Sequence, residues 1–393
     1  MTPSAAPTYS DAQAICIDVS PAVHGRAGIG RYVQSVTAAL LTAAPEQPFV
    51  MFYNRAAQAR PEPPLDRVPA LNNALADKPW RLRVLLAQLM RRCQDGMLPG
   101  VGLFHATDHV LPCLKHIASV FTVYDVTFAV YPETQTVLNR WFLKLAFPRF
   151  LRAAHAVIAI SESTRRDLLR LFGPFDASVH VVYGAVDARF QPATPDAVAR
   201  VRTRYRLPER FVLFVGTIEP RKNLARLLEA ICTLREAGTP VPLVIAGRAG
   251  WHYRPFADQL RRTALGGLVI LPGPVPDAHL PALYSAAEAF VFPSLYEGFG
   301  LPVLEAMACG TPVVASQAAS LPEVAGEAAL LVDPHDVRQL AASIRQVWQD
   351  AGLRAELRGK GWQQVGRFSW EKAAQQTLRI YQEARQVAHA RHA

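Results

Sequence analysis

Short apolar segments alternate with longer, helix-like segments along this chain, and several of the apolar segments end in a glycine turn. The stretch 289–315 shows the pattern most completely. It starts with the apolar run 289–292, continues through a turn that holds Gly298 and Gly300, and ends in the apolar run 312–315. This order predicts a strand, a glycine loop, a short helix and a second strand.

The predicted helix has recognisable ends. Pro302 suits the first helical turn, where no backbone N–H is needed, and Gly310 suits the position just past the last turn. The helix would therefore begin at the glycine loop. Its unpaired N–H groups and the positive end of its dipole favour an anion there, typically a phosphate.

Two carboxylates flank this loop. Glu297 and Glu305 are separated by seven residues. Because a carboxylate next to a phosphate would be repelled, both side chains are better suited to accept hydrogen bonds from hydroxyl groups on either side of it. Hydroxyls, diphosphate and hydroxyls in that order describe a sugar nucleotide. The alternative is a surface turn with two solvated glutamates, because a short motif remains a hypothesis until its context supports it.

Strands and helices alternate over both halves, which predicts two parallel α/β domains. A length of 393 residues fits two domains of about 150 to 200 residues each. The first domain is expected at 1–192 and the second at 193–370, joined by a proline-containing linker at 191–196. The expected strands are 14–19, 49–53, 103–105, 119–125, 211–216, 243–247 and 268–273.

Three further local predictions follow from the same patterns. The stretch 156–164 predicts a strand followed by a helix with Ser161 as N-cap. The stretch 56–77 is rich in Pro and Ala and predicts a loop, and a long helix is expected to start after Ser369 and to end near Arg385.

The charge balance restricts the class of partner. The chain has 42 basic and 32 acidic residues, a net charge of +10. A diffuse excess of this kind favours an anionic ligand or a membrane surface, and the chain has no aromatic-interleaved basic motif of an RNA-binding protein, so no nucleic acid is expected. Residues 1–13 lack the pattern of a leader peptide, and no apolar run approaches ~18 residues. The expected location is cytoplasmic, without a membrane span.

Cysteine and histidine spacing gives no indication of a metal site. The five cysteines are odd in number and widely spaced, and none of the histidines completes a paired pattern of metal ligands. The cysteines are Cys16, Cys93, Cys113, Cys232 and Cys309, and the histidines considered are His109, His116, His155 and His180.

Glycines follow the first predicted strand. Gly25, Gly28 and Gly30 predict a turn that lets the backbone approach a ligand, with Arg31 as an anion partner and a helix from 32 to 41. A plain tight turn is the alternative.

Polar residues follow two later strands of the first half. His105, Tyr124 and Asp125 lie at strand ends, which in doubly wound sheets border the ligand crevice, so they are candidates for an acceptor site. A structural role for the histidine is the alternative. The basic amphipathic segment 80–92 fits either a peripheral membrane helix or a packed surface helix.

Two adjacent cations follow the strand at 211–216. Arg221 and Lys222 stand at a strand-to-helix turn, where they would neutralise a diphosphate. Two solvated surface charges are the alternative.

At this point the second half resembles the donor domain of retaining glycosyltransferases of family 4, and the whole chain resembles their two-domain GT-B architecture. The resemblance is nearly complete over 211–370 and thinner before it. It is carried by the segments 214–224, 273–284 and 296–302, by Glu305, and by the segments 320–324 and 368–370.

The resemblance implies a GT-B fold, α/β, in which two Rossmann-like doubly wound parallel-sheet domains face a central cleft. The segment 371–393 is then a C-terminal helix that packs back on the N-terminal, acceptor-binding domain. The catalytic residues implied are Arg221, Lys222 and Glu297, with Asp125 in the first domain. The donor-binding residues implied are Gly28, Gly30, Thr217, Arg221, Lys222, Val275, Glu297, Phe299, Gly300, Leu301 and Glu305.

Individual roles follow in the same way. Glu305 would hold the ribose, Glu297 would contact the donor sugar, and Arg221 with Lys222 would bind the diphosphate. Three positions depart from the family pattern, and one of them is Tyr183, which stands before Gly184 where asparagine is usual ahead of the linker. Tyr124 stands where many relatives have histidine, and Thr217 stands where many have arginine, which places more of the diphosphate neutralisation on the two cations.

The resemblance further implies transfer of a hexosyl group from a nucleoside diphosphate to a hydroxyl, with retention at the anomeric carbon. No Asp-x-Asp occurs in the chain, so neither a metal ion nor any other cofactor is expected. The expected donor is GDP-mannose and the expected acceptor a lipid-linked saccharide, used in polysaccharide biosynthesis at the inner face of the plasma membrane. The alternatives are a soluble enzyme that uses UDP-glucose and a small sugar, and a non-catalytic scaffold subunit of an assembly complex.

Overall fold

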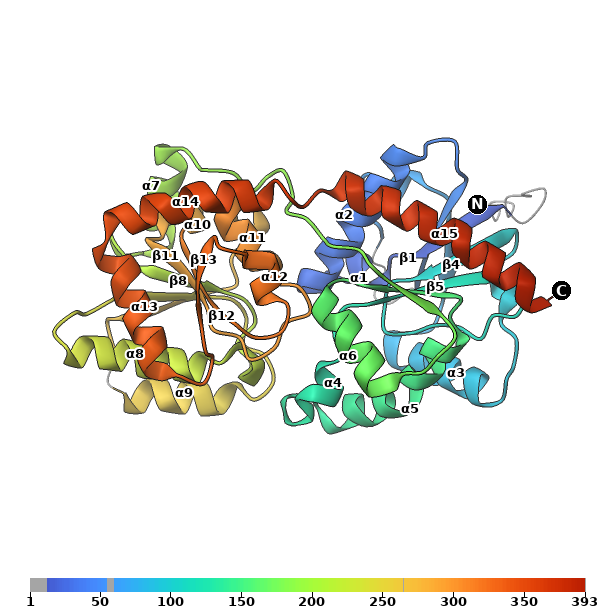
Figure 1. The fold of residues 1–393 in the computed structure, drawn as a ribbon, viewed down its shortest axis with the longest axis horizontal. Coiled ribbons are helices and arrows are strands. Elements are labelled where there is room, and N and C mark those ends of the chain that lie inside the picture. The colour runs from blue at the N-terminus through green and yellow to red at the C-terminus, as the bar shows by residue number, and fades with distance from the viewer. Residues whose placement is uncertain (1–12, 55–59, 264, 393) are drawn as a thin grey trace. The chain divides into compact units, whose positions relative to one another are not determined.

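The computed structural model describes residues 13–54, 60–263 and 265–392 (Figure 1). The chain forms two compact units. The first contains the described residues up to Ala129, then Val137–Gly184 and the segment from Trp370 onward; the second contains Val130–Thr136 and Ala185–Ser369. The two-domain α/β architecture predicted from the alternation of strands and helices is confirmed.

The first unit is built on a parallel sheet of seven strands in the order β3-β2-β1-β4-β5-β6-β7. The central strands are buried apolar runs, as expected for a sheet covered on both faces. The strands are β1 (Ala14–Asp18), β2 (Phe49–Asn54), β3 (Ala70–Asn73), β4 (Val101–Ala106), β5 (Ala118–Val123), β6 (Ala156–Ala159) and β7 (Ser178–Val181).

Helices connect these strands. Ser161 caps α6, as predicted, by accepting a hydrogen bond from the Thr164 N–H. The helices are α1 (Ser20–Val23), α2 (Ala27–Ala43), α3 (Asp77–Leu89), α4 (Thr127–Val130), α5 (Val137–Ala153), α6 (Glu162–Phe172) and α15 (Trp370–His392), with 3-10 turns η1 (Leu65–Arg67), η2 (Asp95–Met97) and η3 (Pro132–Thr134).

The structure corrects two local predictions in this unit. Within the stretch predicted as a loop lies the edge strand β3, whose side chains alternate between exposed and half-buried and which therefore lacks an apolar run; residues 56–59 of that stretch lie outside the described residues. The helix α2 begins at Ala27, earlier than predicted, so Gly28 and Gly30 belong to its first turn. Gly30 is needed there, because a Cβ would lie 2.7 Å from the Pro21 carbonyl oxygen.

The C-terminal helix α15 belongs to the first unit and runs on beyond the predicted end near Arg385. It packs against α2 and against the sheet at β4, β5 and β6, so that a late segment of the chain lies beside an early one (Figure 1). Tyr381 is buried in this contact, and its hydroxyl hydrogen-bonds to His105 Nδ1 at 2.7 Å.

The second unit is built on a parallel sheet of six strands in the order β10-β9-β8-β11-β12-β13. Its strands are β8 (Val212–Val215), β9 (Leu243–Ala246), β10 (Val269–Gly273), β11 (Ala289–Phe292), β12 (Val313–Ser316) and β13 (Ala329–Val332). Its helices are α7 (Pro195–Tyr205), α8 (Leu224–Glu236), α9 (Tyr253–Arg262), α10 (Leu280–Ala286), α11 (Leu301–Ala308), α12 (Leu321–Ala325), α13 (Val337–Gln349) and α14 (Ala351–Val365), with 3-10 turns η4 (Pro220–Lys222) and η5 (Asp277–His279).

The division between the units falls after Gly184, before the predicted linker at 191–196. Residues that follow Gly184 already pack on the second unit. The Phe190 ring lies 6.1 Å from the Tyr284 ring, and the Ala193 N–H donates to Ser285 Oγ at 3.0 Å.

The order in which strands are added reverses in the same way in both sheets. The chain moves outward from the first strand to the third and then returns to the other side of the first strand, at β1/β4 in one unit and at β8/β11 in the other. In doubly wound sheets, ligands bind outside the carboxyl ends of the strands at this switch point. The loops after β1, β4, β8 and β11 are therefore the places to look for a site.

Candidate active site

In the second unit, the loops after β8 and β11 meet through a compact ion cluster. Glu297 accepts a hydrogen bond from Lys222 Nζ at 2.6 Å on one oxygen and from Arg221 Nη1 at 2.6 Å on the other. Arg221 Nη1 also donates to the Tyr296 carbonyl at 2.7 Å, and its Nη2 donates to Glu219 at 2.8 Å. Two cations and two carboxylates thus lie together at the switch point of the sheet.

The cluster is held out of water, which sets the protonation of its members. Lys222 and Glu297 are each 8% exposed. Burial alone would raise the pKa of Glu297, but Arg221 and Lys222 outweigh it and lower that pKa to about 2. Burial, and then the neighbouring Arg221, lower the pKa of Lys222, while Glu297 opposes the shift. Glu297 is therefore a carboxylate at neutral pH.

Backbone and side-chain contacts fix the two loops against each other. The Leu295 N–H donates to the Arg221 carbonyl at 2.9 Å. Asn223 is in the left-handed conformation at the start of α8, and its Nδ2 donates to the carbonyls of Pro293 and Pro334 at 3.0 and 2.6 Å. The position of the cations is therefore determined by the fold and not by side-chain rotamers alone.

The glycine loop leads into α11 as predicted, with Pro302 in its first turn. Gly300 is the N-cap with φ 111°, and a Cβ there would lie 2.7 Å from Leu321 Cδ2, so only glycine fits. Ser320 Oγ fixes the loop, because its one hydroxyl proton is shared between the carbonyls of Glu297 and Phe299, at 2.9 and 2.7 Å. The helix start presents N–H groups that have no partner within the helix.

The remaining predicted donor residues do not belong to the ion cluster. Glu305 is 3% exposed inside α11 and accepts a hydrogen bond from the Tyr284 hydroxyl at 2.9 Å. Thr217 follows β8 and Val275 follows β10, both half-buried, while Leu301 opens α11 next to the buried Phe299. Gly28 and Gly30 lie in α2 of the first unit.

Sequence reasoning missed three supporting residues of this centre. Glu219 pairs with Arg221, Tyr284 fixes Glu305, and Ser320 anchors the glycine loop. The signal for Glu219 was present, since it directly precedes the turn that carries the cations. Tyr284 and Ser320 lie in segments that carry the family resemblance, but no local signal indicates their partners, because each meets its partner only through tertiary packing.

In the first unit, the carboxyl ends of β1 and β4 carry a second, partly buried cluster whose grouping the sequence analysis did not predict. Asp18 ends β1, and Asp108 follows β4. Arg26 donates to Asp108 at 2.6 Å and to Asp77 at 2.9 Å. Burial, and then the nearby Asp108, raise the pKa of Asp18 to about 7. The position of Asp18 at the end of an apolar strand was the available signal.

The acceptor candidates Tyr124 and Asp125 follow β5, which is the neighbour of β4 in the same sheet. Tyr124 is 4% exposed, its ring packs on those of Tyr32 and His109, and its hydroxyl has no hydrogen-bond partner among the described residues. Burial raises the pKa of Tyr124 well above its usual value, and the Thr107 hydroxyl opposes that shift. The same hydroxyl donates to the Asp18 carbonyl. Asp125 is half-buried and accepts from the Thr127 N–H at the start of α4.

His105 requires a correction. It is 1% exposed, and both ring nitrogens are already engaged, with the Tyr381 hydroxyl at 2.7 Å and with Thr122 Oγ1 at 2.7 Å. Burial lowers its pKa to about 3, so the ring is neutral. Because the side chain points into the contact with α15 and not toward solvent, we assign His105 a structural role in place of the predicted acceptor contact.

No helix among the residues described here combines the length and the apolar character that a membrane span requires.

Comparison with known proteins places these observations in a family. The family model Glycosyltransferase Family 4 matches residues 26–190, and the model Glycosyl transferases group 1 matches residues 199–364. O-antigen chain mannosyltransferase B of Escherichia coli is 32% identical over 385 residues, which cover 93% of this chain and 99% of that protein. Serotype-specific mannosyltransferase WbdA of Escherichia coli is 34% identical over 232 residues, which cover 56% of this chain and 28% of WbdA.

Solved structures agree on the fold. Sucrose-phosphate synthase from Thermosynechococcus elongatus superposes with a TM-score of 0.73 at 23% identity, over 94% of this chain and 98% of that one. WaaG, a glycosyltransferase involved in lipopolysaccharide biosynthesis, superposes with a TM-score of 0.70 at 16% identity, over 94% and 99% of the two chains. The chain therefore belongs to glycosyltransferase family 4, with the GT-B fold and with mannosyltransferases of O-antigen synthesis among its homologues.

Proposed function

We propose that this protein transfers a mannosyl group from GDP-mannose to a hydroxyl of a lipid-linked saccharide, with retention at the anomeric carbon and without a metal ion. The bond between the anomeric carbon and the diphosphate breaks, and a bond to the acceptor oxygen forms on the same face of the sugar. The proton of the acceptor hydroxyl passes to the released diphosphate. The observation that carries the proposal is the buried cation pair Arg221 and Lys222 at the switch point of the second sheet.

Electrostatics give this pair its role. Negative charge grows on the departing diphosphate, and fixed cations in a water-poor site stabilise that charge more than they stabilise the ground state. Arg221 and Lys222 are held in place, because both are bonded to Glu297 and the Arg221 carbonyl accepts the Leu295 N–H. The N–H groups at the start of α11 would add to the same effect. A nucleotide-sugar co-substrate fits these groups, and the fold neighbour HepE was solved with UDP-glucose.

The choice of mannose and of a saccharide acceptor rests on homology. One relative that aligns over nearly its whole length is an O-antigen chain mannosyltransferase. Purified protein is expected to turn over GDP-mannose and to leave UDP-glucose intact, and proton NMR of the product is expected to show the α-anomer. Turnover of UDP-glucose alone would contradict the donor assignment, and a β-linked product would contradict retention.

The site assignment has its own test. Lys222→Ala is expected to lower kcat by roughly 10² to 10³-fold, as when one preorganised charge partner of a developing anion is removed. The fold should survive, because Glu297 keeps its bond to Arg221. Lys360→Ala is the control, since Lys360 pairs with Glu356 on the surface of α14. Equal activity of the two variants would contradict the role of Lys222. Addition of a chelator should leave the rate unchanged, and a rate restored only by Mg²⁺ or Mn²⁺ would contradict metal independence.

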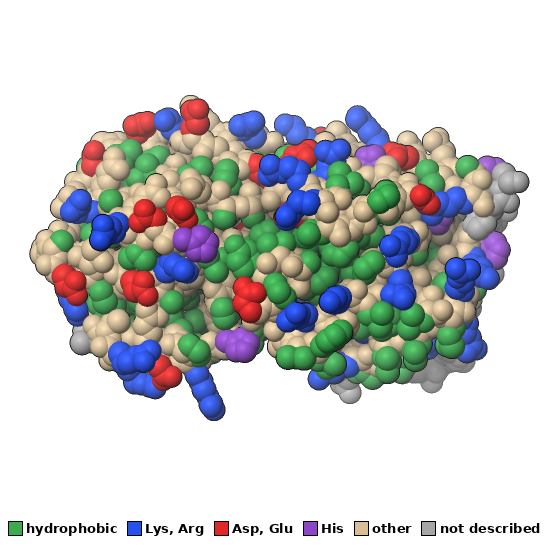
Figure 2. All heavy atoms as spheres, turned by 60° about the horizontal axis from the view of Figure 1, so that its bottom comes forward, with side chains coloured by type: hydrophobic (Ala, Val, Ile, Leu, Met, Phe, Trp, Pro, Cys, Tyr) green, Lys and Arg blue, Asp and Glu red, His purple; other side chains and the backbone are tan. Residues whose placement is uncertain are grey.

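A lipid-linked acceptor calls for contact with a membrane, and we assign that contact to α3 and α5. The two helices are adjacent, because the Arg81 guanidinium lies 4.8 Å from the centre of the Phe142 ring. Together they expose large apolar side chains among basic ones on the first unit (Figure 2). We call this surface the α3–α5 patch: its exposed apolar members are Leu82, Leu86, Leu89, Met90, Val137, Leu138, Trp141 and Leu145, and its basic members are Arg81, Arg83, Arg140 and Lys144.

The composition of this patch suits an anionic bilayer surface. Leu138 and Trp141 are 72% and 65% exposed, so their insertion among lipid headgroups would remove apolar area from water, and each nearby Lys or Arg adds about 1 kcal/mol of attraction. A groove of about 810 Å³ along α3, lined in part by Leu82, Leu86 and Met90, extends the same surface.

Flotation with anionic liposomes tests this assignment. The protein is expected to float with vesicles that contain anionic lipid and to remain at the bottom of the gradient when the vesicles are neutral. The double variant Leu138→Ser, Trp141→Ser is expected to lose flotation with the anionic vesicles. The control is Leu271→Ser, which removes an apolar side chain that is 38% exposed in the second unit. Flotation that the double variant retains in full would contradict the assignment.

A further inference from the structure

Three potential metal ligands meet at the end of the first sheet where β4 and β5 begin. Cys93 follows α3, Asp95 opens the 3-10 turn η2, and His116 precedes β5. One ligand atom from each residue lies within 4.8 Å of the other two. Sequence spacing gave no indication of this group, because Cys93 and Asp95 lie more than twenty positions from His116 and meet it only through the fold.

Backbone contacts hold the two segments in place. The Gln94 N–H donates to the Cys113 carbonyl at 2.8 Å, and the Cys113 N–H donates back to Gln94 Oε1 at 3.1 Å. Asp95 accepts the N–H groups of Lys115 and His116 at 3.0 and 2.9 Å. The ligand atoms are therefore preorganised by the loop conformation, and no large rearrangement is needed to bring them together.

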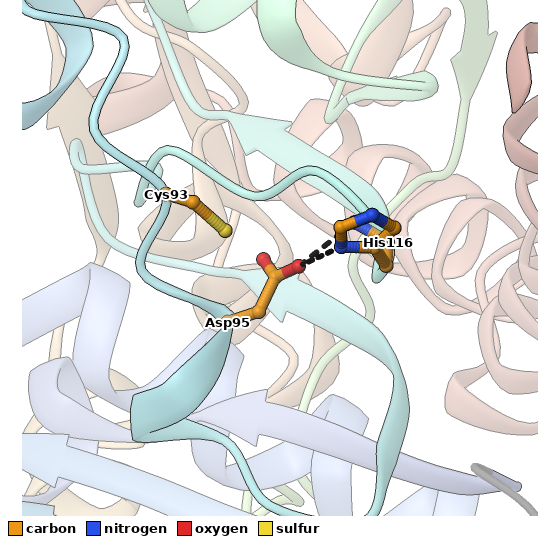
Figure 3. Close-up of side chains that lie close together, drawn as sticks. All are labelled: Cys93, Asp95 and His116. Atoms are coloured by element: carbon orange, nitrogen blue, oxygen red, sulfur yellow. Dashed lines mark hydrogen bonds and ion pairs between the residues drawn. The ribbon is translucent and has the colours of Figure 1, made fainter.

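The side chains are arranged for a shared ion. His116 Nδ1 lies 3.0 Å from Asp95 Oδ2, and the Cys93 side chain points toward the Asp95 carboxylate (Figure 3). The His116 side chain is 79% exposed, and Cys93 is exposed as well, so an ion can reach the group from solvent.

We propose that Cys93, Asp95 and His116 bind one Zn²⁺ ion, with water in the fourth position. Thiolate sulfur, imidazole nitrogen and carboxylate oxygen are the ligand types that Zn²⁺ takes in proteins, usually four in a tetrahedral arrangement. Asp95 Oδ1 accepts the Lys115 N–H on one of its two lone pairs, and the Cys93 thiol, which also hydrogen-bonds to this carboxylate, loses its proton when it binds a metal. The thiolate favours Zn²⁺ over Mg²⁺ or Ca²⁺, which prefer oxygen ligands.

The ion would add a further connection between the segment after α3 and the segment before β5, which the contacts of Gln94 and Asp95 already join. Because the metal binds the folded arrangement and the unfolded chain has no such site, binding would raise the melting temperature. The group lies in the first unit at the amino ends of the strands, whereas the buried cation pair lies in the second unit, so transfer activity is not the readout.

Metal binding to the full chain tests the proposal directly. Protein freed of metal by a chelator and kept reduced is dialysed against zinc chloride, and elemental analysis is expected to give one Zn²⁺ per chain with a higher melting temperature. Replacement by Co²⁺ is expected to give the near-ultraviolet absorption of a thiolate–cobalt bond. An adventitious surface ion would give neither a fixed stoichiometry nor that absorption, and such a result would overturn the proposal.

Variants identify the ligands. Cys93→Ser should abolish the thiolate–cobalt absorption, and His116→Ala should weaken Zn²⁺ binding at least tenfold. Both side chains are exposed, so the fold should survive, which circular dichroism checks. The controls are Cys232→Ser, in α8, and His335→Ala, an exposed histidine of the second unit, and both should bind like the original protein. Unchanged Zn²⁺ binding in Cys93→Ser and His116→Ala would overturn the proposal.

Discussion

Glu297 is the shared partner of Arg221 and Lys222, and its removal takes the bonded carboxylate away from the buried Lys222 and leaves Arg221 with Glu219. Breaking one partner out of a buried ion pair commonly costs roughly 3 to 5 kcal/mol, because a charge is left uncompensated. Glu297→Gln is therefore expected to lower the melting temperature clearly in the absence of nucleotide. GDP should restore much of this loss, because its diphosphate supplies the missing negative charge.

Thermal melts with and without GDP measure the effect. The rise on addition of GDP should be larger in Glu297→Gln than in the original protein, and an equal or smaller rise would contradict the assignment of these cations to the diphosphate. The pH dependence gives a second check. Because the pKa of Glu297 falls from its ordinary 4.5 to about 2, its stabilising contribution is complete above pH 4.5 and is lost as the pH falls toward 2. The variant should lack that acid-dependent loss.

The pKa of Asp18 is shifted upward, opposite to the shift of Glu297. Its pKa is raised from 3.8 to about 7, mainly by burial. The folded protein therefore holds this proton more tightly than the unfolded chain does, and stability falls as the pH rises from about 4 to about 7. Asp18→Asn keeps an oxygen acceptor for the Ser20 N–H, at present 2.9 Å from Asp18 Oδ1, and removes the charge. The variant should gain melting temperature relative to the original protein at pH 8 and not at pH 4.5, and an equal difference at both values would contradict the shifted pKa.

At the scale of elements, the loop before α11 depends on one glycine. Gly300→Ala introduces a side chain at φ 111° and against Leu321, which is expected to cost about 1 to 3 kcal/mol of stability. It should also weaken nucleotide binding, because the helix start shifts. Gly359→Ala is the matched control inside α14, where a Cβ meets nothing within 4 Å and helix propensity favours alanine. Melting temperature and the Kd for GDP test both, and a neutral Gly300→Ala would contradict the geometry.

Elements with a strong local pattern were predictable. The stretch 289–315 folds as strand, glycine loop, helix and strand, because its apolar runs, proline and glycines all favour that arrangement. The edge strand β3 was not predictable, since an edge strand with one face in solvent needs no apolar run. The first turn of α2 was missed because Gly28 and Gly30 disfavour a helix in isolation, and packing against Pro21 compensates.

At the scale of the whole molecule, α15 completes the first unit from the far end of the chain. Tyr381→Phe would leave the buried His105 Nδ1 without its partner at 2.7 Å, which is expected to cost roughly 1 to 3 kcal/mol. Tyr253→Phe, on the half-buried surface of α9, is the control and should be close to neutral. Denaturant unfolding monitored by fluorescence measures the difference, and equal midpoints for both variants would contradict a role of this contact in stability.

The sequence by itself determined the parallel α/β architecture, the strand-end positions of Arg221 and Lys222, and the glycine loop before α11, because these follow from periodicity and from residues that impose a local backbone conformation. Tertiary structure alone decided which side chains share a partner. It brought Glu297 to both cations, joined Arg26 to Asp108, enclosed His105 against Tyr381, and gathered Cys93, Asp95 and His116. Such pairings depend on distances between segments remote in the chain, and local preferences carry no information about those distances.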